Sequence, residues 1–306
     1  MPPATTTLLS GIWEDGLSIE IVDTFRAWMT LFVSTALQAA PFLVAGVVLS
    51  TVVATAARHE RFRARITQRS VLVVPIAAAA GALLPGCECG SVPLANRLVR
   101  SGLRPGAALA FMVSSPAINP IVIVATATAF PGRPGFVIAR FAASLAASIA
   151  IGIVWDLRHG WEWPTTGTDH HDHGSGWRNA ADLAGHDLVH AGGWLIVGAA
   201  IAATSRVLLP DWPPPGLAGG SLTGPLTMAA LAILLSICSE ADAFAAAAMP
   251  QVPLAARLTF LVVGPAIDLK LIAIQRATLG LAVVRILAPL TVAVTVACSM
   301  IAGAWL

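Results

Sequence analysis

Long apolar runs alternate along this chain with short segments that contain Pro, Gly and charged residues. A run of about 20 apolar residues can cross a bilayer as an α-helix. The pattern therefore predicts an all-α integral membrane protein with several spans and with some runs too short for a full span. The expected helical runs are residues 26–56, 71–84, 105–113, 121–130, 136–155, 188–209, 225–237, 254–263, 269–275 and 279–302.

Four polar segments interrupt these runs at places where a helix would otherwise continue. They are residues 85–93 (Pro-Gly-Cys-Glu-Cys-Gly-Ser-Val-Pro), 114–120 (Ser-Ser-Pro-Ala-Ile-Asn-Pro), 238–242 and 264–268. Proline or glycine in three of them opposes a continuous helix. A helix that breaks at membrane depth has to be buried in protein or line a cavity, and ionisable side chains there usually mark a substrate path. We therefore interpret the breaks as parts of a transport site.

The chain contains an internal repeat. Residues 109–119 align with residues 258–268, and six of the eleven positions are identical. Pro116 then corresponds to Pro265, and the same offset of 149 positions pairs Cys89 with Cys238. Corresponding broken segments in two halves are the best sequence pointer to the binding site of a transporter. We expect two repeated halves whose broken helices meet near the membrane midplane.

The chain divides into four parts by composition. Residues 1–25 form an acidic N-terminal segment without the positive region of a cleaved signal peptide. Residues 26–156 form the first membrane repeat and residues 187–306 the second. Between them, residues 157–186 form a polar linker whose Asp-His-His-Asp-His tract we expect to be a solvated connection.

Arginine residues set the expected orientation of the halves. Five Arg and one Glu lie within residues 58–69, and three more Arg lie within residues 97–104. Cytoplasmic loops of membrane proteins carry an excess of Arg and Lys. If residues 85–93 are the tip of a re-entrant hairpin, both clusters and the linker lie in the cytoplasm, and the second half is inverted relative to the first. With four full spans in each half, residues 97–104 and the linker would lie outside; the charge distribution favours the inverted repeat.

Composition excludes several classes of protein. Hydrophobic residues make up 57% of the 306 positions and charged residues only 11%, against about 25% charged residues in soluble domains. There is no basic stripe with interleaved aromatic residues, so we expect no nucleic-acid partner. We also find no phosphate-binding Gly-rich motif, so this chain should not use ATP. We expect a multi-pass protein of the cell membrane that is not an enzyme and carries no cofactor.

Three cysteines at the breaks are candidate ligands. Cys87 and Cys89 are too close in sequence for an unstrained disulfide, and Cys238 lies at the matching break of the second half. Thiolates bind soft metals and thiophilic metalloids such as trivalent arsenic. The alternative is that these are small buried residues that allow close helix packing. Cys298, within a plain apolar run, has only that second role.

Polar residues near the breaks are the other candidates. Glu88 lies between the first two thiols, and Ser115 and Asn119 lie at the second break; with the thiols they form the expected substrate site. The expected coupling groups are Glu240, Asp242 and Asp268, because burial brings a carboxyl pKa toward working pH. The alternatives are an ion pair of Asp268 with Lys270 or Arg257, and helix capping by Asn119 and Ser115.

Four motifs carry a resemblance to a known family. They are residues 85–93, the Ser-Pro-Ala-Ile-Asn-Pro break, Cys-Ser-Glu-Ala-Asp-Ala-Phe at residues 238–244 and Gly-Pro-Ala-Ile-Asp-Leu-Lys at residues 264–270. Together they resemble the ArsP/YraQ-type predicted permeases over nearly the whole chain from about residue 26. The resemblance implies a multi-span inner-membrane permease, and its ArsP branch implies efflux of trivalent organoarsenicals.

We therefore expect a secondary transporter that exports a thiophilic solute, such as a trivalent organoarsenical, and that is coupled to an ion or to protons. Cys87, Cys89 and Cys238 would hold the solute, and Glu240 or Asp268 would carry protons. The alternatives are a transition-metal permease subunit and a membrane thiol-disulfide redox protein. The expected partners are the solute, the lipid bilayer, and either a second copy of the chain or an accessory permease subunit; no separate metal site is assigned.

Overall fold

The computed structural model describes residues 22–37, 72–83, 88–160, 177–208 and 219–306, together with a few isolated positions between 40 and 48. These residues form helices joined by turns, and no strand occurs among them, so the expected all-α fold is confirmed. Residues 22–37 are helical. The labelled helices are α3 (Val73–Leu83), α4 (Glu88–Arg100), α5 (Pro105–Ala117), α6 (Pro120–Ala129), α7 (Pro134–His159), α8 (Trp177–Leu208), α9 (Thr223–Leu235), α10 (Asp242–Ala247), α11 (Leu254–Val263), α12 (Leu269–Leu279) and α13 (Leu281–Gly303).

Three helical stretches of the described chain are long and apolar enough to cross a membrane. They are Pro105–Ala129, which comprises α5 and α6, and the helices α7 and α13. The helices α3, α9 and α11 are apolar but shorter, as the short runs in the sequence predict. The described part of the molecule thus combines full-length spans with half-length helices.

The helix breaks lie where the sequence predicts them. Helix α5 gives way to α6 at residues 118–119, where Asn119 caps a helix whose first residue is Pro120. Helix α9 ends at Leu235 and α10 begins at Asp242, which leaves Cys238 outside a helix. The break between α11 and α12 covers residues 264–268. At the first break, α3 ends before residue 84 and α4 begins at residue 88; residues 84–87, including Cys87, lie outside the described residues.

Two helices begin earlier than the sequence pattern predicts. Helix α4 begins at Glu88 and contains Pro93, whereas the break was expected to extend to that proline. A proline six residues into a helix removes only one hydrogen bond, and an acid at the first position is favoured by the helix dipole. Helix α8 begins at Trp177, within the predicted linker, because residues 177–184 include helix-favouring Ala and Leu among the polar residues and contain neither Pro nor Gly. Polarity alone was a poor guide to the helix boundary there.

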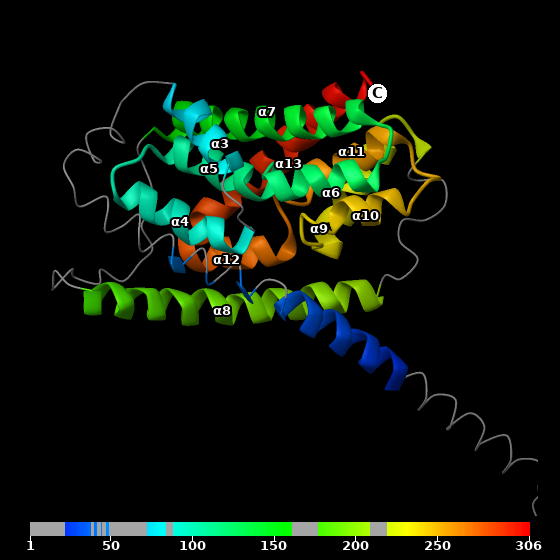
Figure 1. The fold of residues 1–306 in the computed structure, drawn as a ribbon. Helices are drawn as coiled ribbons and strands as arrows, with labels where there is room; N and C mark the ends of the chain where they lie inside the picture. The colour runs from blue at the N-terminus through cyan, green and yellow to red at the C-terminus, as the bar shows by residue number, and fades with distance from the viewer. Residues whose placement is uncertain are drawn as a thin grey trace, which may run out of the picture.

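The offset of 149 positions relates whole helices as well as motifs. Helices α3 to α7 correspond in order to α9 to α13. Residues up to 160 are called the first half below, and residues from 177 onward the second half. Helix α4 of the first half packs against α12 of the second, and α6 packs against α10, which is the corresponding pair with the halves exchanged. The two halves are therefore interlocked through matching helices (Figure 1).

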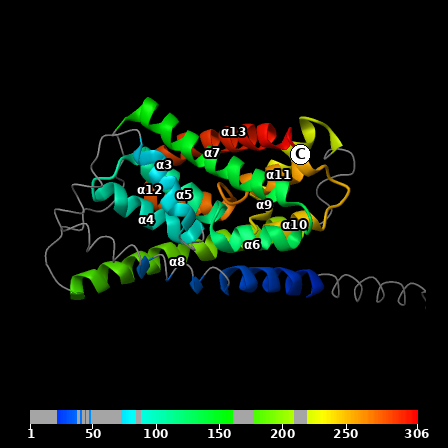
Figure 2. The ribbon, with the colours of Figure 1, turned by 45° about the horizontal axis from the view of Figure 1, so that its top comes forward.

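Helices α7 and α13 lie side by side and run in opposite directions (Figures 1 and 2). One hydrophobic core contains Ile151 and Trp155 near the end of α7 together with Val283 and Leu287 near the start of α13. The second core contains Phe136 and Ala143 from the start of α7 and Val296 from near the end of α13. Each core thus takes residues from both halves.

Helix α8 covers another side of the bundle. It packs against α12 and, less extensively, against α9 and α4. Near its C-terminal end, Oγ1 of Thr204 accepts a hydrogen bond of 3.0 Å from Nε1 of Trp28, so the helix of residues 22–37 lies next to α8. Figure 2 shows these two helices along the lower edge of the bundle.

Candidate substrate site between the halves

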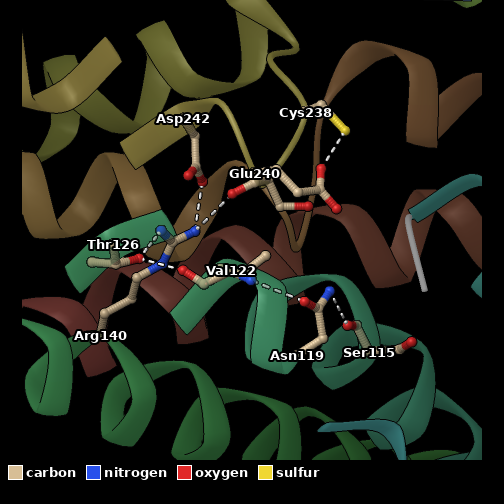
Figure 3. A network of polar contacts seen from close by, with 9 residues as sticks. Ser115, Asn119, Val122, Thr126, Arg140, Cys238, Glu240 and Asp242 are labelled. Carbon is tan, nitrogen blue, oxygen red and sulfur yellow. Dashed lines mark hydrogen bonds and ion pairs between the residues drawn. The ribbon is translucent and has the colours of Figure 1, made fainter. Parts of the chain in front are cut away.

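A buried arginine connects the two halves. Nη2 of Arg140, in α7, lies 2.7 Å from Oδ2 of Asp242, the first residue of α10. Nη1 of Arg140 donates to Oγ1 of Thr126 in α6 at 2.7 Å, and that hydroxyl donates to the carbonyl oxygen of Val122 at 2.7 Å. The side chains of Arg140 and Asp242 are only 3% and 2% exposed. Loss of either partner would leave an uncompensated charge in the protein interior. Figure 3 shows these contacts.

The segment before α10 contains Cys238, the one candidate thiol ligand whose side chain the structure describes. Sγ of Cys238 lies 2.8 Å from Oε2 of Glu240, and the thiol is the donor of this hydrogen bond. Both side chains are partly buried. The carbonyl oxygen of Cys238 accepts from the backbone N–H groups of Ala241 and Asp242 at 2.9 and 3.0 Å, which makes the turn into α10. Nη2 of Arg140 also reaches the carbonyl oxygen of Ser239 at 3.5 Å, so the arginine contacts the same turn.

The break between α5 and α6 is held by its own asparagine. Oδ1 of Asn119 accepts from the backbone N–H of Val122 at 3.0 Å, and Nδ2 donates to the carbonyl oxygen of Ser115 at 3.2 Å. Both polar residues are buried. The amide therefore caps α6 and closes the end of α5, as one of the alternatives for this break predicted.

The matching break of the second half is held by an aspartate. Oδ1 of Asp268 accepts from the backbone N–H of Leu271 at 2.6 Å, and Oδ2 lies 3.4 Å from Nζ of Lys270. The hydroxyl of Ser236, a residue with φ of 47°, accepts from the backbone N–H of Leu269 at 3.2 Å. The ion pair with Lys270 that the sequence left open is therefore present, in addition to a helix cap.

The structure brings together some of the predicted site residues. Cys238, Glu240 and Asp242 lie on one turn, and that turn meets α6, the helix capped by Asn119, through the contacts of Arg140 (Figure 3). Asp268 lies at the corresponding cap in the second half. Glu88 and Cys89 lie in the first turn of α4, but their side chains, and all of Cys87, lie outside the described residues. Among the described residues no group of three or more His, Cys, Asp or Glu side chains could hold a metal ion.

Sequence reasoning missed the central cation. Arg140 interrupts an otherwise apolar run, and a charge within a predicted span is itself a sign of function. The sequence gives no indication of which of the carboxylates it meets, because Asp242 is more than 100 positions away. Thr126 was not singled out either; a single Thr in an apolar helix is too common to indicate a contact.

The carboxylates of this site differ in whether a cation neutralises them. Two buried carboxylates are held by cations, Asp242 by Arg140 and Asp268 by Lys270. Glu240 has no ion pair within the described part of the chain, and its Oε1 is buried there without a hydrogen-bond partner. Glu240 can therefore take the proton that Cys238 has to lose before its sulfur becomes a ligand.

Comparison with known proteins agrees with the sequence motifs. The family model ArsP_1, described as "Predicted permease", matches residues 24–304. The protein named "UPF0718 protein YcgR" of Bacillus subtilis is 32% identical over 253 residues, which cover 79% of this chain and 85% of the relative. A Streptococcus mutans protein named "Putative two-component membrane permease complex subunit" is 28% identical over 253 residues, or 79% of this chain and 83% of the relative. No solved structure matches. The chain thus belongs to the ArsP_1 family of predicted membrane permeases.

Proposed function

We propose that this permease is a secondary transporter that exports a thiophilic solute, with a trivalent organoarsenical as the leading candidate. The observation that carries the proposal is the Cys238 thiol, 2.8 Å from Glu240, on a non-helical turn that contacts the other half through Arg140. Soft centres such as trivalent arsenic bind thiolates in preference to oxygen or nitrogen ligands. Cys87 and Cys89, near the break in the first half, would supply further thiolates.

Glu240 is the best candidate for proton coupling. When the sulfur of Cys238 binds the solute, its proton passes to Oε2 of Glu240 and from there to a displaced hydroxide ligand or to water. Asp242 and Asp268 are less suited to this role, because each already neutralises a buried cation. Protonation of either would leave that cation without its counter-charge.

The transport cycle would use two halves that are inverted repeats. The antiparallel pair α7 and α13 supports this orientation, as do the exchanged contacts of α4 with α12 and of α6 with α10. The hydrogen bond between Trp28 and Thr204 also fits the repeat. At the offset of 149, Trp28 corresponds to Trp177 and Thr204 to Thr55, so both positions carry the same residue type in each half. Inverted repeats can exchange conformations to open the site to alternate sides.

The direct test is transport by membrane vesicles of the full chain. Cys238→Ser should reduce uptake of a trivalent methylarsenical into everted vesicles by at least about tenfold, because the hydroxyl is a harder and far less acidic ligand of similar size. Cys298→Ser, in α13, is the matched control and should transport normally. Normal transport of the arsenical by Cys238→Ser would rule out the thiol-ligand mechanism.

The name of the Streptococcus mutans relative favours a second arrangement, in which this chain is one subunit of a two-component permease. The cargo could then be a soft transition metal bound by the same thiols. Production of the chain alone separates the two cases: we expect arsenical transport without another protein. Transport that requires a second membrane component from the native host would support the two-component form.

A further inference from the structure

The guanidinium of Arg140 contacts both halves of the protein. Its guanidinium binds a hydroxyl on α6, a carboxylate on α10 and the carbonyl oxygen of Ser239. The first of these acceptors belongs to the same half as Arg140, and the other two belong to the second half. A planar guanidinium with several donors can hold such groups in a fixed relative geometry. Arg140 therefore fixes the turn that contains Cys238 and Glu240 against the first half.

The internal repeat shows that the Arg140–Asp242 ion pair has no counterpart at the related positions of the two halves. Arg140 corresponds by the offset of 149 to Pro289 in α13, and Asp242 corresponds to Pro93 in α4. Both prolines lie inside their helices, where each removes a backbone hydrogen bond and neither can form an ion pair. The caps, by contrast, are kept in both halves, as Asn119 and Asp268. The ion pair is thus an asymmetric feature of the repeated architecture.

We propose that Arg140 is a positioning residue and that its ion pair with Asp242 stabilises one of the two alternating-access states. The inference rests on the proposed transport function. If the halves exchange conformations, the contact between α7 and α10 in one state becomes a contact between α13 and α4 in the other. The positions related to Arg140 and Asp242 are prolines, so the second contact lacks this ion pair, and the pair favours the state that contains it. Opening of the pair is then a step of each transport cycle.

The experiment measures from which side of the membrane Cys238 can be reached. A membrane-impermeant maleimide is added to sealed vesicles of either orientation, and labelling of Cys238 in the full chain is read by mass spectrometry of peptides. The variant is Arg140→Gln with Asp242→Asn, which removes both charges and leaves neither uncompensated. We expect the ratio of labelling from the two sides to change by about tenfold, a typical size for coupling between two states.

The matched control is a partly buried ion pair within a single half. Nε of Arg104 lies 3.0 Å from Oδ2 of Asp156, and the side chains are 17% and 8% exposed. The pair joins the start of α5 to the end of α7. Arg104→Gln with Asp156→Asn should lower thermal stability without changing the labelling ratio. An equal change of the ratio in both double variants would overturn the proposal, because it would reflect general loosening.

A milder variant keeps the proposal testable if the double variant does not accumulate. Thr126→Val removes the acceptor of Nη1 but keeps the ion pair, and it should change the ratio several-fold, since a hydrogen bond to a charged group contributes substantially to stability. A folded Arg140 or Thr126 variant with an unchanged ratio would show that the cluster is only structural. The arsenical assay with Cys238→Ser tests the transport proposal separately, because the labelling readout does not require Cys238 to be a ligand.

Discussion

At the scale of single residues, the same structural task is carried out differently in the two halves. Asn119 and Asp268 both accept a hydrogen bond from the backbone N–H three residues later and cap α6 and α12. Asp268 brings a charge, and Lys270 neutralises it; the residue that corresponds to Lys270 in the first half is Ile121. The lysine is therefore explained by the charge of the aspartate cap.

This comparison predicts the effect of exchanging residues between the halves. Asp268→Asn should keep the cap but leave Lys270 charged and buried, with a loss of stability of about 3–5 kcal/mol. Adding Lys270→Ile reproduces the pair Asn119 and Ile121 of the first half and should recover most of the lost stability. Thermal unfolding in detergent checks both variants. Transport of arsenical by the double variant would exclude Asp268 as the coupling group, whereas a folded but inactive double variant would support it.

Much of the site could be predicted from residue types, and its pairings could not. Cys238, Glu240 and Asp242 stand out because polar residues are rare in this chain, and their place at a break follows from the repeat. The partner of each charge depends on how α7 and α10 meet across the halves, and no local pattern encodes that contact. The sequence therefore predicts that these three residues lie at a helix break but not that Asp242 is bound to Arg140.

At the scale of helices, small residues determine how closely neighbours approach. A Cβ atom added to Gly106 in α5 would collide with the carbonyl oxygen of Gly152 in α7, and one added to Gly152 would collide with that of Gly106. Asp156 accepts from the backbone N–H of Gly106 at 2.8 Å beside this contact. In the second half, Gly303 approaches Ala255 in the corresponding place, where α11 meets α13.

The effect of a Gly→Ala substitution on stability should therefore depend on what surrounds the glycine. Gly152→Ala should destabilise the protein by about 1–3 kcal/mol, because the obstacle is backbone and cannot move aside. Gly135→Ala, in the same helix, meets nothing within 4 Å and should be neutral or slightly stabilising, since alanine favours a helix. Melting temperatures of the two variants in one detergent give the comparison. Equal effects would show that close packing of α5 and α7 does not limit stability.

Helix breaks were the most predictable elements, because proline or glycine coincides with a polar residue at three of the four, and the repeat points to the fourth. Helix starts in polar sequence were the least predictable: composition marks residues 177–186 as linker, although the structure continues α8 back to Trp177. Helix formation there depends on the absence of breaking residues more than on hydrophobicity. Boundaries of this kind need tertiary packing to be decided.

At the scale of the whole molecule, the proposed inverted arrangement makes a prediction about sidedness. Arg133 lies exposed at the turn before α7, Arg100 at the end of α4 and Arg276 near the end of α12. With inverted halves, a cysteine at position 133 should be labelled from outside, and cysteines at positions 100 and 276 from the cytoplasm. Impermeant maleimide on intact cells measures this. Labelling of position 100 or 276 from outside would contradict the topology.

The interlocked halves also constrain how the protein is made. At about 5–20 residues per second, synthesis of residues 161–306 takes roughly 7–30 seconds. Until their second-half partners are made, α4 lacks α12 and α6 lacks α10, and Arg140 is in the membrane without the carboxylate that neutralises it. The nascent first half therefore has to be sheltered by the insertion machinery until the second half arrives. Residues 1–160 produced alone should be degraded, while co-production of residues 161–306 should rescue them into one assembled permease.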